Sequence, residues 1–196
     1  IPRPDDVQGR RYLETNGAVE GLDFEIDDAS VVVVEGTRRF RLPKGSPAYD
    51  TRRPGGWPRG VREVVTERSL FKAHGTFYML PRGNSGGGAG IKPICTHGKW
   101  ISDFCSWRGM LVLAGTKSGA KPDGHYVAAA DGKAGLWFGD IDDLWRLGKP
   151  RGIGGPWRNT AVEADVRSDP YLMTGYDKQT MLLSHDSTSD VVFSVE

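Results

Sequence analysis

Histidine is the residue type in this sequence that titrates near neutral pH and can act as acid, base or metal ligand. Four are present: His74, His97, His125 and His185. None has the spacing of a local metal motif such as His-Glu-X-X-His, so we assign no metal-binding residues. His74 falls in an expected hairpin turn, where we expect an exposed structural role.

His97, Asp103 and His125 are the residues that we expect to be catalytic if the chain is an enzyme. His97 follows a glycine-rich stretch, and His125 follows a turn and enters an expected strand. A histidine would serve as acid or base, and Asp103 would orient it or act as an acid. This hypothesis requires His97 and His125 to meet in space. Other aspartates are explained by turn chemistry and capping.

A second group of side chains suits a sugar ligand. Arg108 could hold a carboxylate with paired hydrogen bonds. Trp107, Tyr126 and Trp157 could stack on sugar rings, although some aromatic residues must belong to the core. Residues 38–72 carry ten basic residues against three acidic ones, a pattern that suits either a carboxylate or sulfate ligand or a solvated face.

Repeated hairpins are the elements that must position these residues. Residues 70–80 and 104–114 align at a shift of thirty-four residues, each with two apolar stretches around an X-Gly turn. Glycine adopts the positive φ that such turns need. An earlier copy covers 31–42 around Glu35-Gly36-Thr37, and a later one covers 171–184.

Two further segments have the pattern of strands. Residues 135–145 alternate aromatic and small side chains, although Asp142-Asp143-Leu144-Trp145 could instead begin a short helical turn after an aspartate cap. The last residues, 191–195, also form a β-type run. Because native chains seldom stop in mid-strand, we expect a piece of a longer chain.

A β unit every 34 to 39 residues predicts an all-β fold, either a β-propeller or part of one. The alternative is a β-sandwich, whose strands also recur regularly. We expect residues 1–196 to form a single β-rich domain of four or five blades. Such a number suits a small propeller or a fragment of a larger one.

Composition limits the classes of partner and compartment. The net charge of +1 gives no reason to expect nucleic acid, and no run of eighteen apolar residues predicts a membrane span. Cys95 and Cys105 allow one disulfide at most, and we expect Cys105 to be a small core residue. The polar opening leaves a cytoplasmic protein, a mature secreted or periplasmic one, or a piece of a longer chain. The sequence identifies no cofactor: it contains no P-loop, and no Gly-X-Ser-X-Gly elbow either.

Residues 101–109, 136–145 and 168–177 carry a resemblance to a known group. They are similar to the C-terminal blades of large, uncharacterised bacterial β-propeller proteins from polysaccharide-degrading systems. The similarity spans roughly residues 65–196 and includes no catalytic motif of a named enzyme family. In related-looking propeller hydrolases and lyases the active site lies in the central funnel, but no such motif matches this chain residue by residue.

These features give three functional hypotheses. The first is a carbohydrate-active β-propeller, a glycoside hydrolase or polysaccharide lyase acting on an acidic or polar glycan. The second is a non-catalytic carbohydrate-binding or scaffold module, and the third is a structural fragment without activity. An enzyme should place two titratable groups in one concave pocket, whereas a binding module should expose aromatic rings without such a pair. Expected partners are a glycan, the rest of a larger propeller, or a second copy of the chain.

Overall fold

The computed structural model describes residues 22–50, 59–65, 68–81, 85–99, 101–115, 124–132 and 135–196. The strands are β1 (Leu22–Ile26), β2 (Val31–Glu35), β3 (Arg38–Leu42), β4 (Arg59–Val65), β5 (Arg68–Ala73), β6 (Thr76–Leu80), β7 (Lys92–Thr96), β8 (Phe104–Trp107), β9 (Met110–Ala114), β10 (Tyr126–Ala128) and β11 (Gly135–Gly139). The helical turns are short 3₁₀ segments: η1 (Pro47–Tyr49), η3 (Gly87–Gly90) and η4 (Ile141–Leu147).

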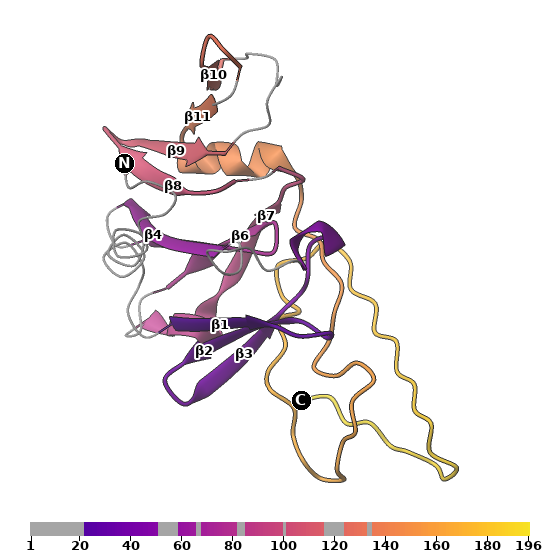
Figure 1. Ribbon diagram of the computed structural model, residues 1–196. Helices are drawn as coiled ribbons and strands as arrows, with labels where there is room; N and C mark the ends of the chain where they lie inside the picture. Colours follow the sequence, from indigo (N-terminus) through magenta and orange to yellow (C-terminus); the bar gives the residue numbers. More distant parts are fainter. Residues whose placement is uncertain are drawn as a thin grey trace, which may run out of the picture.

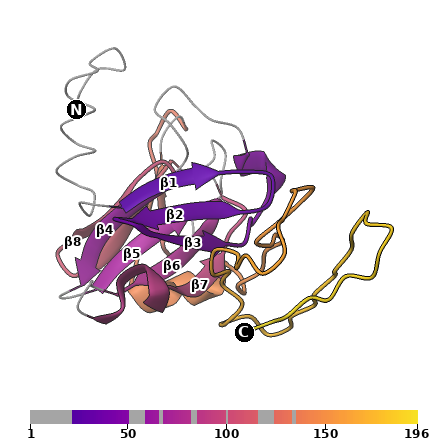
Figure 2. The same cartoon turned by 90° about the horizontal axis from the view of Figure 1, so that it is seen from below.

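The described strands form three antiparallel sheets, stacked one on another (Figure 1). The first has the strand order β1-β2-β3, the second β4-β5-β6-β7 and the third β10-β11-β9-β8. The view from below shows the first sheet lying across the second (Figure 2). The predicted all-β class is confirmed, while the choice between propeller and sandwich remains a hypothesis because no described sheet closes on itself.

Three of the four expected hairpins form where the repeat places them. Strands β5 and β6 meet through Ala73 and Thr76, and β8 and β9 meet through Trp107 and Met110. The two turns each hold a non-glycine residue and a glycine at positive φ, as a type I′ turn requires. Strands β2 and β3 are joined by the two-residue turn Gly36-Thr37, in which the glycine comes first and Gly36 alone has a positive φ, of 61°.

Alternation along the strands builds two cores. The first core lies between the first and second sheets and contains Phe24, Val33, Phe71 and Tyr78. The second core lies between the second and third sheets. Its members include Leu70, Phe77, Cys95, Phe104, Leu111, Leu113, Trp137 and Leu144. Neighbouring residues of the second sheet therefore point into different cores, so that both faces of this sheet are buried.

Strand β11 ends at Gly139, so the strand-like pattern of residues 135–145 does not form one continuous strand. Asp140 is the N-cap of η4, and its backbone N–H donates to the Asp143 carboxylate at 2.9 Å. The alternative of a helical turn after an aspartate cap is thus confirmed. The side chain of Leu144 lies in the second core, whereas Trp145 is 72% exposed.

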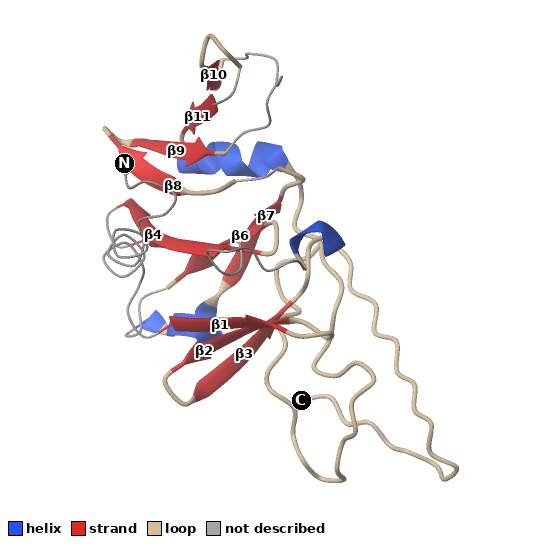
Figure 3. Ribbon diagram, viewed as in Figure 1, coloured by secondary structure: helices blue, strands red, loops and turns tan. Residues whose placement is uncertain are grey.

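The hairpin expected at 171–184 and the strand expected at 191–195 do not form. Beyond η4 the chain runs as loop to the C-terminus (Figure 3). One isolated parallel bridge joins Tyr171 to Arg41, where Arg41 N–H donates to Pro170 O and Leu172 N–H donates to Arg41 O, both at 2.8 Å. The next donors of this ladder would be Pro43 and Pro170, which have no N–H. The pairing therefore stops after one bridge.

Candidate functional site

His74 anchors the segment that leads from β3 into η1. Its Nδ1 accepts hydrogen bonds from the backbone N–H groups of Gly45 (3.0 Å) and Ser46 (3.3 Å). The proton of the neutral ring must therefore be on Nε2, which donates to Asp50 Oδ1 at 3.0 Å. Asp50 also forms an ion pair with Lys44 at 2.8 Å. Because both ring nitrogens are engaged, His74 is a structural residue.

The expectation that His74 would be exposed is wrong, since its side chain is buried in the hairpin turn. Burial lowers its pKa, and the neighbouring Asp50 carboxylate only partly opposes this effect. The turn itself was identified from the sequence. The segment that covers the turn lies about thirty residues away along the chain, and no local pattern indicates that contact.

His97 lies just after β7 in an aromatic environment. Its ring contacts Phe77 (centroids 5.2 Å apart) and Tyr49 (6.4 Å), and its Nδ1 donates to Lys99 O at 3.0 Å. Burial and the positive charge of Lys72 lower the pKa of His97 to about 4. The ring is thus neutral at pH 7. Its Nε2 is buried without a hydrogen-bond partner among the described residues, and the residue is 3% exposed.

Asp103 and His125 have partners in the third sheet. Asp103 Oδ1 accepts from the Phe104 backbone N–H at 2.8 Å. His125 Nδ1 donates to Phe138 O at 2.8 Å, and its ring stacks on Trp137 at 5.3 Å. The contacts described for His97, Asp103 and His125 involve different partners. Their joint catalytic role remains a prediction.

Trp107, Arg108 and Tyr126 also belong to the third sheet or its hairpin. Trp107 is 50% exposed, meets the Phe138 ring at 6.4 Å and carries the Arg108 guanidinium over its ring at 4.9 Å. Within the described residues Arg108 forms no ion pair. Tyr126 is buried opposite Trp137. Their proposed role in substrate binding is likewise untested.

The basic run in residues 38–72 is largely neutralised where its side chains are described. Arg38 pairs with Glu35, and Arg41 contacts both Asp27 (2.6 Å) and Asp169 (3.0 Å). Arg39 also reaches Asp169, at 3.3 Å. Lys72 is buried and donates to the carbonyl of Ile101. The sequence left an anion-binding site and a solvated face as alternatives, and these contacts show instead that the described charges are paired within the protein.

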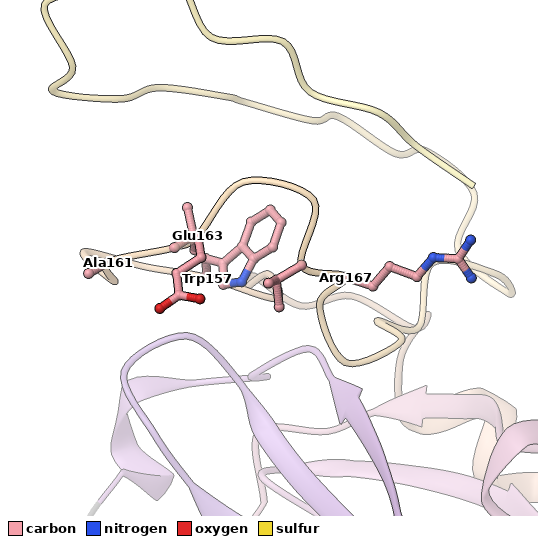
Figure 4. Close-up of a pocket in the computed structure, with 6 residues that line it drawn as sticks. Trp157, Ala161, Glu163 and Arg167 are labelled. Carbon is pink, nitrogen blue, oxygen red and sulfur yellow. The ribbon is translucent and has the colours of Figure 1, made fainter.

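Trp157 lines an open surface pocket of about 240 Å³, whose lining residues are all exposed. The lining residues are Trp157, Ala161, Val162, Glu163, Val166 and Arg167. The Glu163 carboxylate lies beside the indole, whereas the Arg167 side chain extends away from it (Figure 4). Arg167 pairs with Glu196 at 3.2 Å. Within the described residues, Glu163 has no hydrogen bond or ion pair, so its carboxylate is available to a ligand.

The two cysteines are free thiols. Cys95 is buried in the second core, and burial raises its pKa to about 12. The expectation of a core position for Cys105 is wrong, because Cys105 is exposed on the face of β8 opposite the buried Phe104.

Neither a metal-binding cluster nor a membrane-spanning helix is found in the described part of the chain. It holds no cluster of three or more His, Cys, Asp or Glu side chains that could bind a metal ion. Nor do the described ranges contain a helix of the length and apolar character needed to cross a membrane.

In comparisons with protein-family models, curated proteins and solved structures, no match to the chain was found.

Proposed function

We propose that the chain is a non-catalytic, carbohydrate-binding module of β-propeller type whose ligand is an acidic or polar glycan. The observation that carries this proposal is the Trp157 pocket. An indole face suits the apolar face of a sugar ring, and the free Glu163 carboxylate can accept hydrogen bonds from ring hydroxyls. Arg167 also lines the pocket, but its guanidinium points away from the indole and pairs with Glu196, so the sugar contacts are assigned to Trp157 and Glu163.

The pocket favours binding over catalysis. Glu163 is its single carboxyl group, and Arg167 stays charged in proteins, so the pocket offers no acid–base pair. Pockets for larger ligands occupy roughly 300–1,000 Å³. At about 240 Å³, this one suits one sugar ring with the rest of the chain outside.

The stacking of the sheets supports the propeller part of the proposal. Two of the three sheets have four strands, and successive sheets pack face to face across a shared core, as neighbouring blades do. The second sheet follows the simple order of a blade, since each strand pairs with the next along the chain.

The proposal is tested on a glycan array that includes uronic-acid oligosaccharides, beside an assay for release of reducing ends. Wild type and His97→Ala are compared. We expect wild type to bind an acidic or polar glycan and to release no product, with binding unchanged in His97→Ala. Product release that is lost in His97→Ala would overturn the binding module in favour of the glycoside hydrolase or polysaccharide lyase. An array without any bound glycan would overturn the binding module, and the absence of product release as well would overturn the enzyme.

A further inference from the structure

The third sheet has one face in the second core and a second face on the opposite side, here named the outer face. Because Phe104, Leu111, Leu113 and Trp137 point into the core, alternation and the strand register assign their neighbours to the outer face. Its members are Cys105, Trp107, Met110, Val112, Ala114, Val127, Leu136 and Phe138.

The outer face contains no charged residue, amide or hydroxyl group. Trp107 is 50% exposed, Val127 61% and Leu136 40%. A sheet with one face in water normally alternates apolar and polar residues, whereas a sheet covered on both sides is apolar on both. Exposed apolar patches of this kind mark interaction sites. The outer face therefore has the composition of a surface that another layer covers.

The C-terminal segment, residues 180–195, also exposes apolar side chains that no other part of the described chain covers. Leu182 is 92% exposed, Val192 89% and Val195 71%. Within the described residues this segment forms no strand pair. The segment projects from the side of the first sheet, at the end of the stack away from the third sheet (Figures 1 and 2). Residues 180–195 are thus far from the outer face of their own molecule.

The charges beside the outer face and in the C-terminal segment indicate which partner covers the outer face. Residues 180–195 contain Asp186 and Asp190 and no lysine or arginine. Arg108, in the turn beside the outer face, has no carboxylate partner among the described residues. An apolar segment with acidic neighbours thus complements an apolar face with a free cation at its rim, and one chain carries both.

We propose that the outer face binds residues 180–195 of a second copy of this chain. The contact covers both exposed apolar features at once and places Asp186 and Asp190 near Arg108. It is head-to-tail, because two different surfaces meet, so each copy retains one surface of each kind for a further copy or for closure of a ring. Trp157, the residue that defines the glycan pocket, belongs to neither surface.

Sedimentation velocity on the full chain at increasing concentration tests the proposal, at about 50 mM and about 500 mM salt, across which screening increases strongly. We expect wild type to assemble with concentration and less so in high salt. Leu136→Lys and Leu182→Lys should each weaken assembly about tenfold or more. Ile153→Lys, at an 80% exposed residue outside both surfaces, should assemble like wild type. Circular dichroism checks that each variant is folded.

The thiol of Cys105 gives a second, local readout. Since Cys105 lies on the outer face, its labelling rate should fall as wild type assembles and stay fast in Leu182→Lys. Wild type that remains monomeric at all concentrations would overturn the proposal. So would assembly that Leu136→Lys abolishes and Leu182→Lys leaves intact, since two outer faces would then pack on each other.

Discussion

His74 and Arg108 occupy the same position in two hairpin turns thirty-four residues apart, with φ angles of 48° and 51°. A non-glycine residue is strained at positive φ, where asparagine and glycine are preferred. Three hydrogen bonds hold His74 there, to Gly45, Ser46 and Asp50. Among the residues that the structure describes, the Arg108 side chain has only its stacking on Trp107. Hydrogen bonds within the fold thus compensate the backbone strain at His74, whereas the strain at Arg108 is compensated much less.

Replacement of each residue by asparagine should separate the two turns. In His74→Asn the backbone N–H groups of Gly45 and Ser46 lose their buried acceptor, so the free energy of unfolding should fall by about 2–3 kcal/mol. Arg108→Asn removes backbone strain and also an exposed cation–π contact, and the two effects are of similar energy and opposite sign. The free energy of unfolding should therefore change by less than about 0.5 kcal/mol. Urea unfolding at pH 7 measures both. Equal losses would contradict the structural role of His74.

Gly75 and Gly109 give a second matched pair, with φ angles of 79° and 81°. Alanine at either position adds about 1 kcal/mol of backbone strain. A Cβ on Gly75 would lie 2.4 Å from the Tyr49 ring, whereas a Cβ on Gly109 meets nothing within 4 Å. Gly75→Ala should therefore destabilise the protein by at least about 1 kcal/mol more than Gly109→Ala, because overpacking adds to strain. Similar thermal unfolding midpoints for the two variants would show that Tyr49 moves aside freely.

The pH dependence of stability should reflect His97. Its pKa is lowered from 6.5 to about 4 in the folded protein, so the unfolded chain binds more protons between these values. The contribution of His97 to the free energy of unfolding is therefore complete above pH 6.5, and it is lost as the pH falls from 6.5 to about 4. At about 1.4 kcal/mol per pH unit, it amounts to about 3 kcal/mol. His74, whose pKa is also lowered, changes stability in the same direction.

Urea unfolding of wild type and His97→Phe at pH 7, 5 and 4 measures this effect. Phenylalanine fits the contacts with Phe77 and Tyr49, and Lys99 O keeps its hydrogen bond from the Tyr49 hydroxyl. The variant should lose less stability on acidification than wild type. His185→Ala, in an exposed part of the chain, serves as the control and should follow wild type. Parallel curves for wild type and His97→Phe would rule out a shifted pKa at His97.

The sequence predicted the hairpins with a strong local signal and failed where distant segments decide. The X-Gly turns at Gly75 and Gly109 formed as expected, because a two-residue turn and its flanking apolar stretches are local. Burial of His74 depends on residues 45–50, and exposure of Cys105 depends on which face of the third sheet packs against the second core. Residues 171–184 have strand-forming side chains, but Pro43 and Pro170 remove the donors that the neighbouring edge would need.

The candidate site was only partly accessible to sequence reasoning. Trp157 was selected as a residue that could stack on a sugar, and it does line a pocket. Glu163 was missed, because a lone glutamate in a polar stretch has no pattern that distinguishes it from a solvated one. Its availability became evident only from its place beside the indole and from the absence of a partner among the described residues.

Thiol labelling at low protein concentration tests the assignment of the two cysteines. Cys105 should react rapidly, because it is exposed, whereas Cys95 should react only as fast as the protein unfolds. Its burial and raised pKa both suppress the thiolate. Two equally fast thiols would show that the second core opens readily around Cys95.

Calorimetric titration with the strongest-binding glycan of the array tests the central claim most directly, in wild type, Trp157→Ala and Trp145→Ala. Trp145 is a more exposed tryptophan outside the pocket and controls for loss of an indole. The Trp157 pocket predicts that Trp157→Ala weakens binding at least tenfold, which is about 1.4 kcal/mol, and that Trp145→Ala binds like wild type. Unchanged affinity in Trp157→Ala would contradict the proposed site.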